Sequence, residues 1–173
     1  NGLEKLLVNS EIKADIGKHI YGIGTAQRGG EYSRFGETVE SSLKGKRKYK
    51  AYTTFGSIHN IDLVSKGELS FGIAQGDLLA TKKTKGDNLR ALISLYPEAI
   101  QVVVLAESSL TNVTELRNLE VNIGPLGSGS RDNALQVLKA HGIDEFSIKA
   151  RSYSILEALD KLKAKDLSAI IFT

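Results

Sequence analysis

The sequence predicts an α/β fold with largely parallel sheets, and two observations support this prediction. Short apolar runs alternate with helix-like segments along almost the whole 173-residue chain, which is typical of parallel strands joined by crossover helices. Several of these runs end in loops rich in Gly, Ser or Thr that lead directly into a helix. In parallel sheets such loops gather at the carboxyl ends of the strands, where α/β proteins bind their ligands.

The expected elements follow from apolar runs and helix signals along the chain. Residues 1–18 form a polar lead-in with weak helical periodicity. Apolar runs that predict strands or extended buried segments are residues 19–24, 49–55, 69–74, 89–95, 100–106, 121–123, 147–153 and 167–173. Helical periodicity covers residues 31–43, 57–64, 111–119, the segment around 134–138, and 155–165. Thr111 or Asn112 is the expected N-cap of the third helix, and Ser130 or Asp132 that of the fourth.

Composition restricts the classes of function. The chain contains no cysteine, which excludes disulfides, thiolate catalysis and Cys-ligated zinc. The net charge of +3 permits an anionic ligand but does not require nucleic acid. No run approaches the ~18 apolar residues of a membrane span. His19, His59 and His141 lie far apart without metal-ligand spacing, so we expect no metal site.

Three strand-to-helix junctions have the composition of an anion site: residues 24–28, 54–57 and 127–130. Glycines let the backbone approach a ligand, while the first amides of a helix lack helical partners and favour negative charge. Ser128 and Ser130 add hydroxyl donors. Taken alone, residues 127–130 are equally typical of a tight turn that caps a helix. The repetition of the pattern favours the ligand-binding interpretation.

Two nucleotide-binding motifs are absent from these junctions. The phosphate loop GxxxxGK[ST] needs a Lys before Ser128 or Ser130, and the sequence has none there. The run Gly22-x-Gly24 has Gln27 where the dinucleotide motif has its third glycine. Tyr32 stands in the first turn of a helix, where a phenol can reach a ligand on the preceding loop or pack as a partly buried side chain.

Neither nucleic-acid binding nor catalysis is expected. The basic run of residues 44–50 lies at a helix end and leads into a strand, and we interpret it as a solvated face that protects an edge strand. Glu31 and Asp77 are the nearest carboxylates to the junctions, and neither has an evident base or nucleophile beside it. The available chemistry is therefore recognition without bond-breaking, with no enzymatic activity and no cofactor.

Four blocks of the sequence resemble one family in their order. The blocks are IYGIGTAQRGGEYSRFG, AYTTFGSIHNIDLVSKGELSFGIAQGD, LRALISLYPEAIQVVV and VNIGPLGSGSRDNALQVLKAHGI. They are similar to the TAXI-type solute-binding proteins of tripartite ATP-independent periplasmic (TRAP) transporters, which often carry the name immunogenic protein. The resemblance runs from about residue 20 to residue 173. Four ordered blocks are far more specific than a single glycine motif.

The resemblance implies a fold like that of type II periplasmic binding proteins, with two α/β lobes and a ligand cleft between them. Residues 1–104 would form the first lobe and residues 105–173 the second. The implied function is that of a periplasmic receptor, monomeric and exported with a signal peptide that is later removed. It would capture a small carboxylate, either glutamate- or glutamine-like or a dicarboxylate, and deliver it to the membrane permease subunits of a TRAP transporter.

The resemblance also implies a set of ligand-binding residues, because the family's motifs fall on particular positions of this chain. The family's Q-S-D segment becomes Gln75-Gly76-Asp77, which lacks the serine hydroxyl, and its GSGT loop ends in Ser130 in place of Thr. The implied ligand-binding residues are Gly24, Thr25, Ala26, Tyr32, Thr54, Ser57, Asn60, Gln75, Gly127, Ser128, Gly129 and Ser130.

Two further expectations concern the extent of the chain and an alternative function. The absence of methionine and the family's usual continuation beyond the last strand predict an incomplete chain that lacks its C-terminal remainder. The alternative function is the effector-sensing domain of a transcription regulator with the same fold. A DNA-binding helix-turn-helix would then precede it, and residues 1–18 are too short to provide one.

Overall fold

The computed structural model describes residues 2–15, 18, 20–43, 45, 47–81 and 89–173. The chain divides into two compact units, Asn1–Ser94 and Leu95–Thr173. The resemblance implied a boundary after residue 104, whereas the observed division leaves the whole apolar run of residues 100–106 in the second unit. Within the described residues, no helix is long and apolar enough to cross a membrane.

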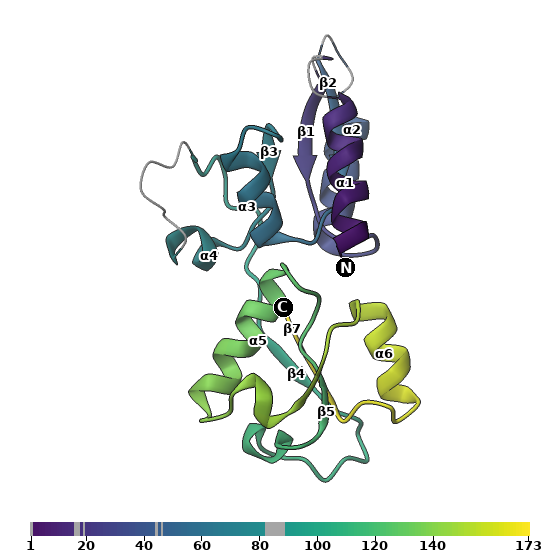
Figure 1. The fold of residues 1–173 in the computed structure, drawn as a ribbon, viewed down its shortest axis with the longest axis vertical. Helices are drawn as coiled ribbons and strands as arrows, with labels where there is room; N and C mark the ends of the chain where they lie inside the picture. The colour runs from purple at the N-terminus through teal and green to yellow at the C-terminus, as the bar shows by residue number, and fades with distance from the viewer. Residues whose placement is uncertain (1, 16–17, 19, 44, 46, 82–88) are drawn as a thin grey trace. The chain divides into compact units, whose positions relative to one another are not determined.

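The first unit contains a parallel sheet of three strands with the order β2-β1-β3 (Figure 1). Register pairs Tyr21 with Tyr49 and Ile23 with Phe71. Because the strands are parallel, their carboxyl ends share one edge of the sheet. The elements of this unit are α1 (Gly2–Asp15), β1 (Ile20–Gly24), α2 (Glu31–Ser42), β2 (Lys48–Tyr52), α3 (Ser57–Ser65), β3 (Phe71–Gly72) and α4 (Gly76–Thr81).

The second unit contains four strands in the order β4-β7-β5-β6, of which β4 runs antiparallel to β7. The pairs β5·β6 and β5·β7 are parallel, as the alternation of strands and helices predicted. The elements of this unit are β4 (Gln101–Val103), η1 (Val113–Leu116), β5 (Glu120–Asn122), α5 (Gly129–Ala140), η2 (Glu145–Ser147), β6 (Lys149–Arg151), α6 (Ile155–Lys163) and β7 (Ala169–Phe172).

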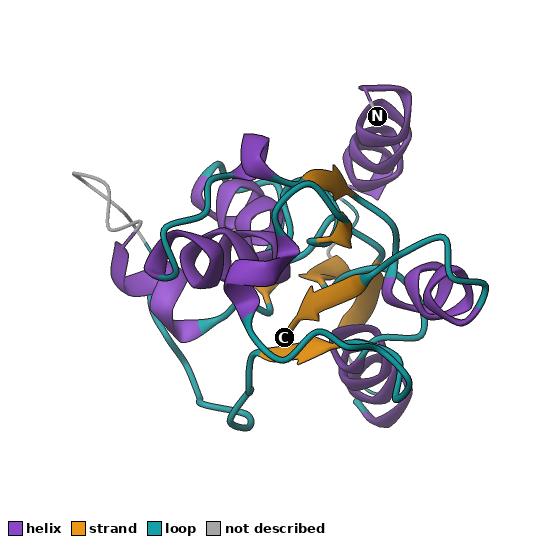
Figure 2. Cartoon of the chain, turned by 90° about the horizontal axis from the view of Figure 1, so that it is seen from below, coloured by secondary structure: helices purple, strands orange, loops and turns teal. Residues whose placement is uncertain are grey.

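The last strand, β7, holds the second unit together because it is buried on both faces. Ile171 packs in the cluster that contains Leu138 of α5, whereas Ile170 packs in the cluster that contains Leu162 of α6. Successive side chains of a strand point to opposite faces, so α5 and α6 cover opposite sides of the sheet (Figures 1 and 2). Side chains buried on both faces explain the unbroken apolar sequence of this strand.

Several predicted elements differ from those observed. The run of residues 89–95 forms no strand, and Leu92 and Ile93 are 75% and 76% exposed. The predicted helix at residues 111–119 is the short 3₁₀ turn η1, which begins at an Asn112 capping box and is followed by Asn118 at φ 62°. A helix, α4, begins at Gly76, where only the end of a strand was expected. The predicted strand of residues 19–24 is β1, and residue 19 lies outside the described residues.

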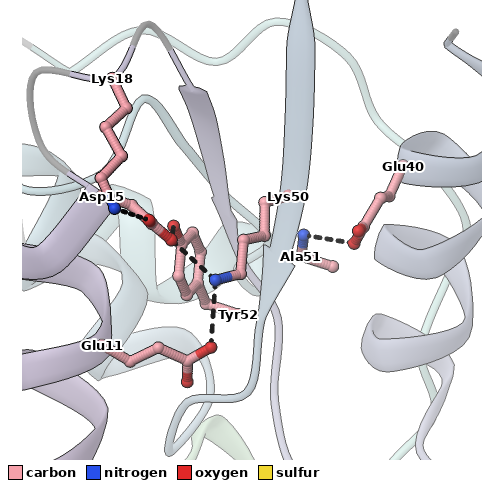
Figure 3. A network of polar contacts seen from close by, with 7 residues as sticks. All are labelled: Glu11, Asp15, Lys18, Glu40, Lys50, Ala51 and Tyr52. Atoms are coloured by element: carbon pink, nitrogen blue, oxygen red, sulfur yellow. Dashed lines mark hydrogen bonds and ion pairs between the residues drawn. The ribbon is translucent and has the colours of Figure 1, made fainter.

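A network of polar contacts joins α1 to the sheet of the first unit (Figure 3). Lys50 Nζ lies 2.7 Å from Asp15 Oδ2 and 3.2 Å from a Glu11 oxygen. The Tyr52 hydroxyl donates to the same Asp15 oxygen at 2.8 Å. Hydrogen bonds from Lys50, Tyr52 and Lys18 hold the pKa of Asp15 far below its usual range, and burial together with the bond to Asp15 raises the pKa of Tyr52 to about 12.

Replacing Asp15 with Asn is expected to lower the thermal unfolding midpoint of the first unit. A carboxylate with a depressed pKa stabilises the fold above its unfolded-state pKa of ~3.9, and this stability is lost as the pH falls. The difference between Asp15→Asn and the parent protein should therefore be largest near neutral pH and shrink towards pH 2. Thermal unfolding followed by circular dichroism across this range measures it.

The matched control is Asp62→Asn, which breaks the Lys66–Asp62 pair on the surface of α3. Surface pairs of this kind stabilise proteins little, so the unfolding midpoint should barely move. A midpoint of Asp15→Asn that equals the parent's at pH 7 would contradict the role given to the network.

Candidate functional site

The three strands of the first unit end at loops that carry most of the residues expected to bind a ligand. Thr25 and Ala26 follow β1, Thr54 follows β2, and Gln75 follows β3. The structure therefore brings these residues to one edge of the sheet, as the sequence predicted. Tyr32 lies half-buried in the first turn of α2.

The side chain of Asn60, on α3, connects all three strand ends. It is fully buried, and its Nδ2 donates to the Thr25 carbonyl at 2.5 Å and to the Ile73 carbonyl at 2.7 Å. The Thr54 hydroxyl lies 2.6 Å from its Oδ1. Both amide hydrogens and the amide oxygen of Asn60 thus have partners inside the chain, which is what a buried amide requires.

The hydroxyls of this edge are similarly engaged. Thr25 Oγ1 donates to the Tyr52 carbonyl at 2.8 Å, and the Gly56 amide donates to Thr54 Oγ1 at 3.1 Å. Gly24 allows this arrangement because a Cβ at its position would stand 2.5 Å from Asn60 Oδ1. The local role of these side chains is therefore to fix the loops.

Backbone amides at the start of a helix are further hydrogen-bond donors at this edge. The N-cap of α3 is Gly56, at φ 100° and without a side-chain cap, so the amides of Ser57 and Ile58 at the start of this helix need another acceptor. Ser57 Oγ accepts the Gln75 amide at 3.2 Å. The Gln75 side chain is 8% exposed, and its Oε1 has no partner among the described residues.

The loop between β5 and α5 forms the corresponding edge of the second unit. Gly124 and Gly127 have φ values of 87° and 83°, which favour glycine. Ser128 caps α5: its Oγ accepts the Arg131 amide at 3.1 Å and donates to the Pro125 carbonyl at 2.8 Å. The expectation that Ser130 or Asp132 caps this helix was wrong, because the helix begins at Gly129.

Ser130 instead joins α5 to the end of β7. The Thr173 amide donates to Ser130 Oγ at 3.3 Å, and Asn133 Nδ2 donates to Thr173 Oγ1 at 2.9 Å. The amides of Gly129 and Ser130 are first-turn amides, outside the hydrogen-bond ladder of the helix. As in the first unit, the hydroxyls hold the loop through bonds within the chain.

Arg131 is a residue that the sequence analysis missed. Its guanidinium reaches back from α5 to the Gly124 carbonyl, Ser152 Oγ and the Glu145 carboxylate. The available signal was a basic residue directly after the Gly/Ser loop, inside the first turn of the helix. Among the described residues, no group of His, Cys, Asp and Glu could hold a metal ion.

Comparison with known proteins assigns the chain to a family and shows which solved structures share its fold. A family model described as the NMT1-like family matches residues 23–173. The alkanesulfonate-binding protein SsuA from Xanthomonas axonopodis pv. citri, solved with MOPS, matches with a TM-score of 0.58 and 19% identity over 89% of this chain and 54% of its own. The periplasmic aliphatic sulphonate binding protein SsuA from Escherichia coli matches with a TM-score of 0.54 and 17% identity, over 89% of this chain and 51% of its own.

A third structure, Tv2483 bound to L-arginine, matches with a TM-score of 0.55 and 14% identity over 95% of this chain and 68% of its own. At these identities the likeness shows the fold, which is of the type II periplasmic-binding-protein kind that the sequence predicted. The chain spans about half the length of the two sulfonate-binding proteins.

Asn60→Ala is expected to destabilise the first unit by roughly 2 to 4 kcal/mol, because it leaves the Thr25 and Ile73 carbonyls buried without their donor. Chemical denaturation measures the free energy of unfolding. Ser65→Ala, at an exposed position of the same helix, is the control and should change that free energy by less than about 0.5 kcal/mol. If the two variants changed the free energy of unfolding equally, the central role given to Asn60 would be contradicted.

Ser128→Ala should destabilise the second unit by about 1 kcal/mol through loss of the N-cap, whereas Ser128→Gly should cost only a few tenths. The same denaturation experiment compares the two variants with the parent protein. If Ser128→Gly were as destabilising as Ser128→Ala, the serine would stabilise the unit by something other than the cap.

Proposed function

Because the chain belongs to the NMT1-like family, we propose that it acts as an extracytoplasmic solute-binding protein. Its solute is a small carboxylate, either glutamate- or glutamine-like or a dicarboxylate, which it delivers to the membrane permease subunits of a TRAP transporter. The carboxylate and the transporter class rest on the resemblance of the four sequence blocks to TAXI-type receptors. The protein is not an enzyme in this proposal, because its loops present donors without a paired acid and base.

One observation carries the proposal: at both sheet edges the hydroxyls of Thr25, Thr54 and Ser128 are engaged within the chain, and first-turn amides remain. In the first unit these are the amides of Ser57 and Ile58, at the start of α3, which follows an uncapped Gly56. In the second unit they belong to Gly129 and Ser130 of α5. Amides at a helix N-terminus favour an anionic group by hydrogen bonding and by the helix dipole.

The names of the similar structures are consistent with such a ligand. Two are described as sulfonate-binding proteins, and one was solved with L-arginine, which carries a carboxylate. Sulfonates and carboxylates share acceptor oxygens and negative charge, and backbone amides recognise these two features without regard to the rest of the molecule. The set that we propose is the one implied by the resemblance, in which Gly24, Thr25, Thr54 and Asn60 fix the loops, whereas Ala26, Gly127 and Gly129 contribute backbone atoms to ligand binding.

Mass spectrometry of the solute released from the denatured protein tests this function directly. The protein is purified from cells without added ligand, and a panel of L-glutamate, L-glutamine, succinate, L-arginine and ethanesulfonate is then titrated while thermal stability is followed. A recovered amino acid or dicarboxylate that restabilises the protein is the expected result, since a ligand specific for the native state raises stability. A protein without solute, unaffected by the whole panel, would favour the sensing domain of a regulator.

Gly129→Pro is expected to weaken binding of the recovered solute by roughly tenfold or more, the loss of one hydrogen bond to a charged group. Proline fits the first position of a helix and removes only an amide that has no helical partner. Ser128, which precedes it, has φ −85° and ψ 151°, the extended conformation that a residue before proline prefers. Calorimetric titration gives the affinity.

The control is Gly129→Ala, which adds a side chain but keeps the amide. Its affinity should stay within about threefold of the parent, because the charged hydrogen bond remains. Equal losses in both variants would mean that the added atoms, and not the missing amide, weaken binding.

A further inference from the structure

Arg131 occupies a position where its charge is unfavourable by itself. The N-terminal turn of a helix carries partial positive charge and favours acidic residues, so a cation there is repelled. Its side chain is nevertheless only 13% exposed, which adds a cost of desolvation and of lost rotamer freedom. A residue that breaks a local rule in a well-packed unit needs a compensating role.

The contacts of Arg131 show what compensates for this cost. Nη1 donates to the Gly124 carbonyl at 3.2 Å, in the loop after β5, and to Ser152 Oγ at 3.0 Å, in the loop after β6. Nη2 forms an ion pair with Glu145 of η2. One guanidinium therefore bridges the two loops that follow neighbouring parallel strands, and its charge lies at the same edge as the amides of Gly129 and Ser130.

We propose that Arg131 is a positioning residue for the anion and that Glu145 limits its effect. The guanidinium fixes the loop of residues 124–130 and adds positive potential to it. Glu145, 37% exposed on its side chain, cancels part of that potential and keeps binding weak enough for release. This inference rests on the proposed function, because it assumes that the loop binds an anionic solute.

The partial neutralisation by Glu145 distinguishes this role from a purely structural one. Glu145→Gln removes the charge but keeps an acceptor for Nη2. If Arg131 only holds the two loops together, this change should weaken that contact or leave it unchanged, so the affinity for the anion would fall or stay constant. If the charge of Arg131 acts on the anion, the same change should raise affinity. The two roles thus predict effects of opposite sign.

The experiment compares Glu145→Gln, Arg131→Lys and Arg131→Gln in the full chain, with L-glutamate and ethanesulfonate as probes. We expect Glu145→Gln to bind the probe three- to tenfold more tightly at low ionic strength, which is roughly the effect of one screened charge. The gain should be smaller in 0.5 M salt, because the Debye length there is only about 4 Å and charges are screened more strongly. Arg131→Gln should bind more weakly than the parent, and Arg131→Lys, which keeps the charge, should recover part of the loss.

Glu107→Gln is the matched control. It removes a carboxylate from the Lys165–Glu107 ion pair of the same unit, where Glu107 follows the antiparallel strand β4 and so lies away from the loop of residues 124–130. Its affinity should equal that of the parent. Unchanged or weaker binding by Glu145→Gln would overturn the role of Arg131 while leaving the proposed function intact. Failure of the parent itself to bind these probes or any other member of the panel used to test the proposed function would overturn both.

Discussion

The architecture of the first unit depends on one buried amide. Asn60 lies on the helix that follows β2, yet its side chain donates hydrogen bonds to carbonyls that follow β1 and β3 and accepts one from the Thr54 hydroxyl. Parallel strands cannot be joined by a tight hairpin, so their ends are held only by what packs across them. A fully buried amide with all its partners satisfied fixes this edge more specifically than apolar packing does, because an unpaired carbonyl there is costly.

The second unit achieves the same result with different residues. Asn122 Oδ1 accepts the Tyr153 amide at 2.8 Å, which extends the pairing of β5 and β6 beyond their last ladder bond. Ser128 closes the loop onto the helix, and Ser130 attaches that helix to the end of β7. The two units share a principle: polar side chains at the carboxyl edge join loops to strands, so the first-turn amides beside them are held in fixed directions.

The sequence predicted the order and class of these elements because strand–loop–helix junctions leave a local signal of composition and period. It failed where structure depends on a distant partner. Residues 89–95 are apolar enough for a strand, but a run becomes a strand only when another strand pairs with it, and Leu92 and Ile93 remain exposed. Helix α4 is too short to show a period, and Arg131 was overlooked because its contacts come from Gly124, Ser152 and Glu145.

The same limitation applies to the residues expected to bind a ligand. A Thr, Ser or Asn in a glycine-rich loop reveals a capacity for hydrogen bonding, but residue type cannot reveal which partner uses it. In this chain the hydrogen-bonding groups of three such residues bond to other parts of the protein: those of Thr25, Thr54 and Asn60. In the function that we propose, recognition of an oxyanion is then left to backbone amides, which are the same for every carboxylate or sulfonate. On that proposal, discrimination between such solutes comes from side chains with a polar atom that has no partner among the described residues, such as the buried Gln75 Oε1, and from charges that set how strongly any anion is held.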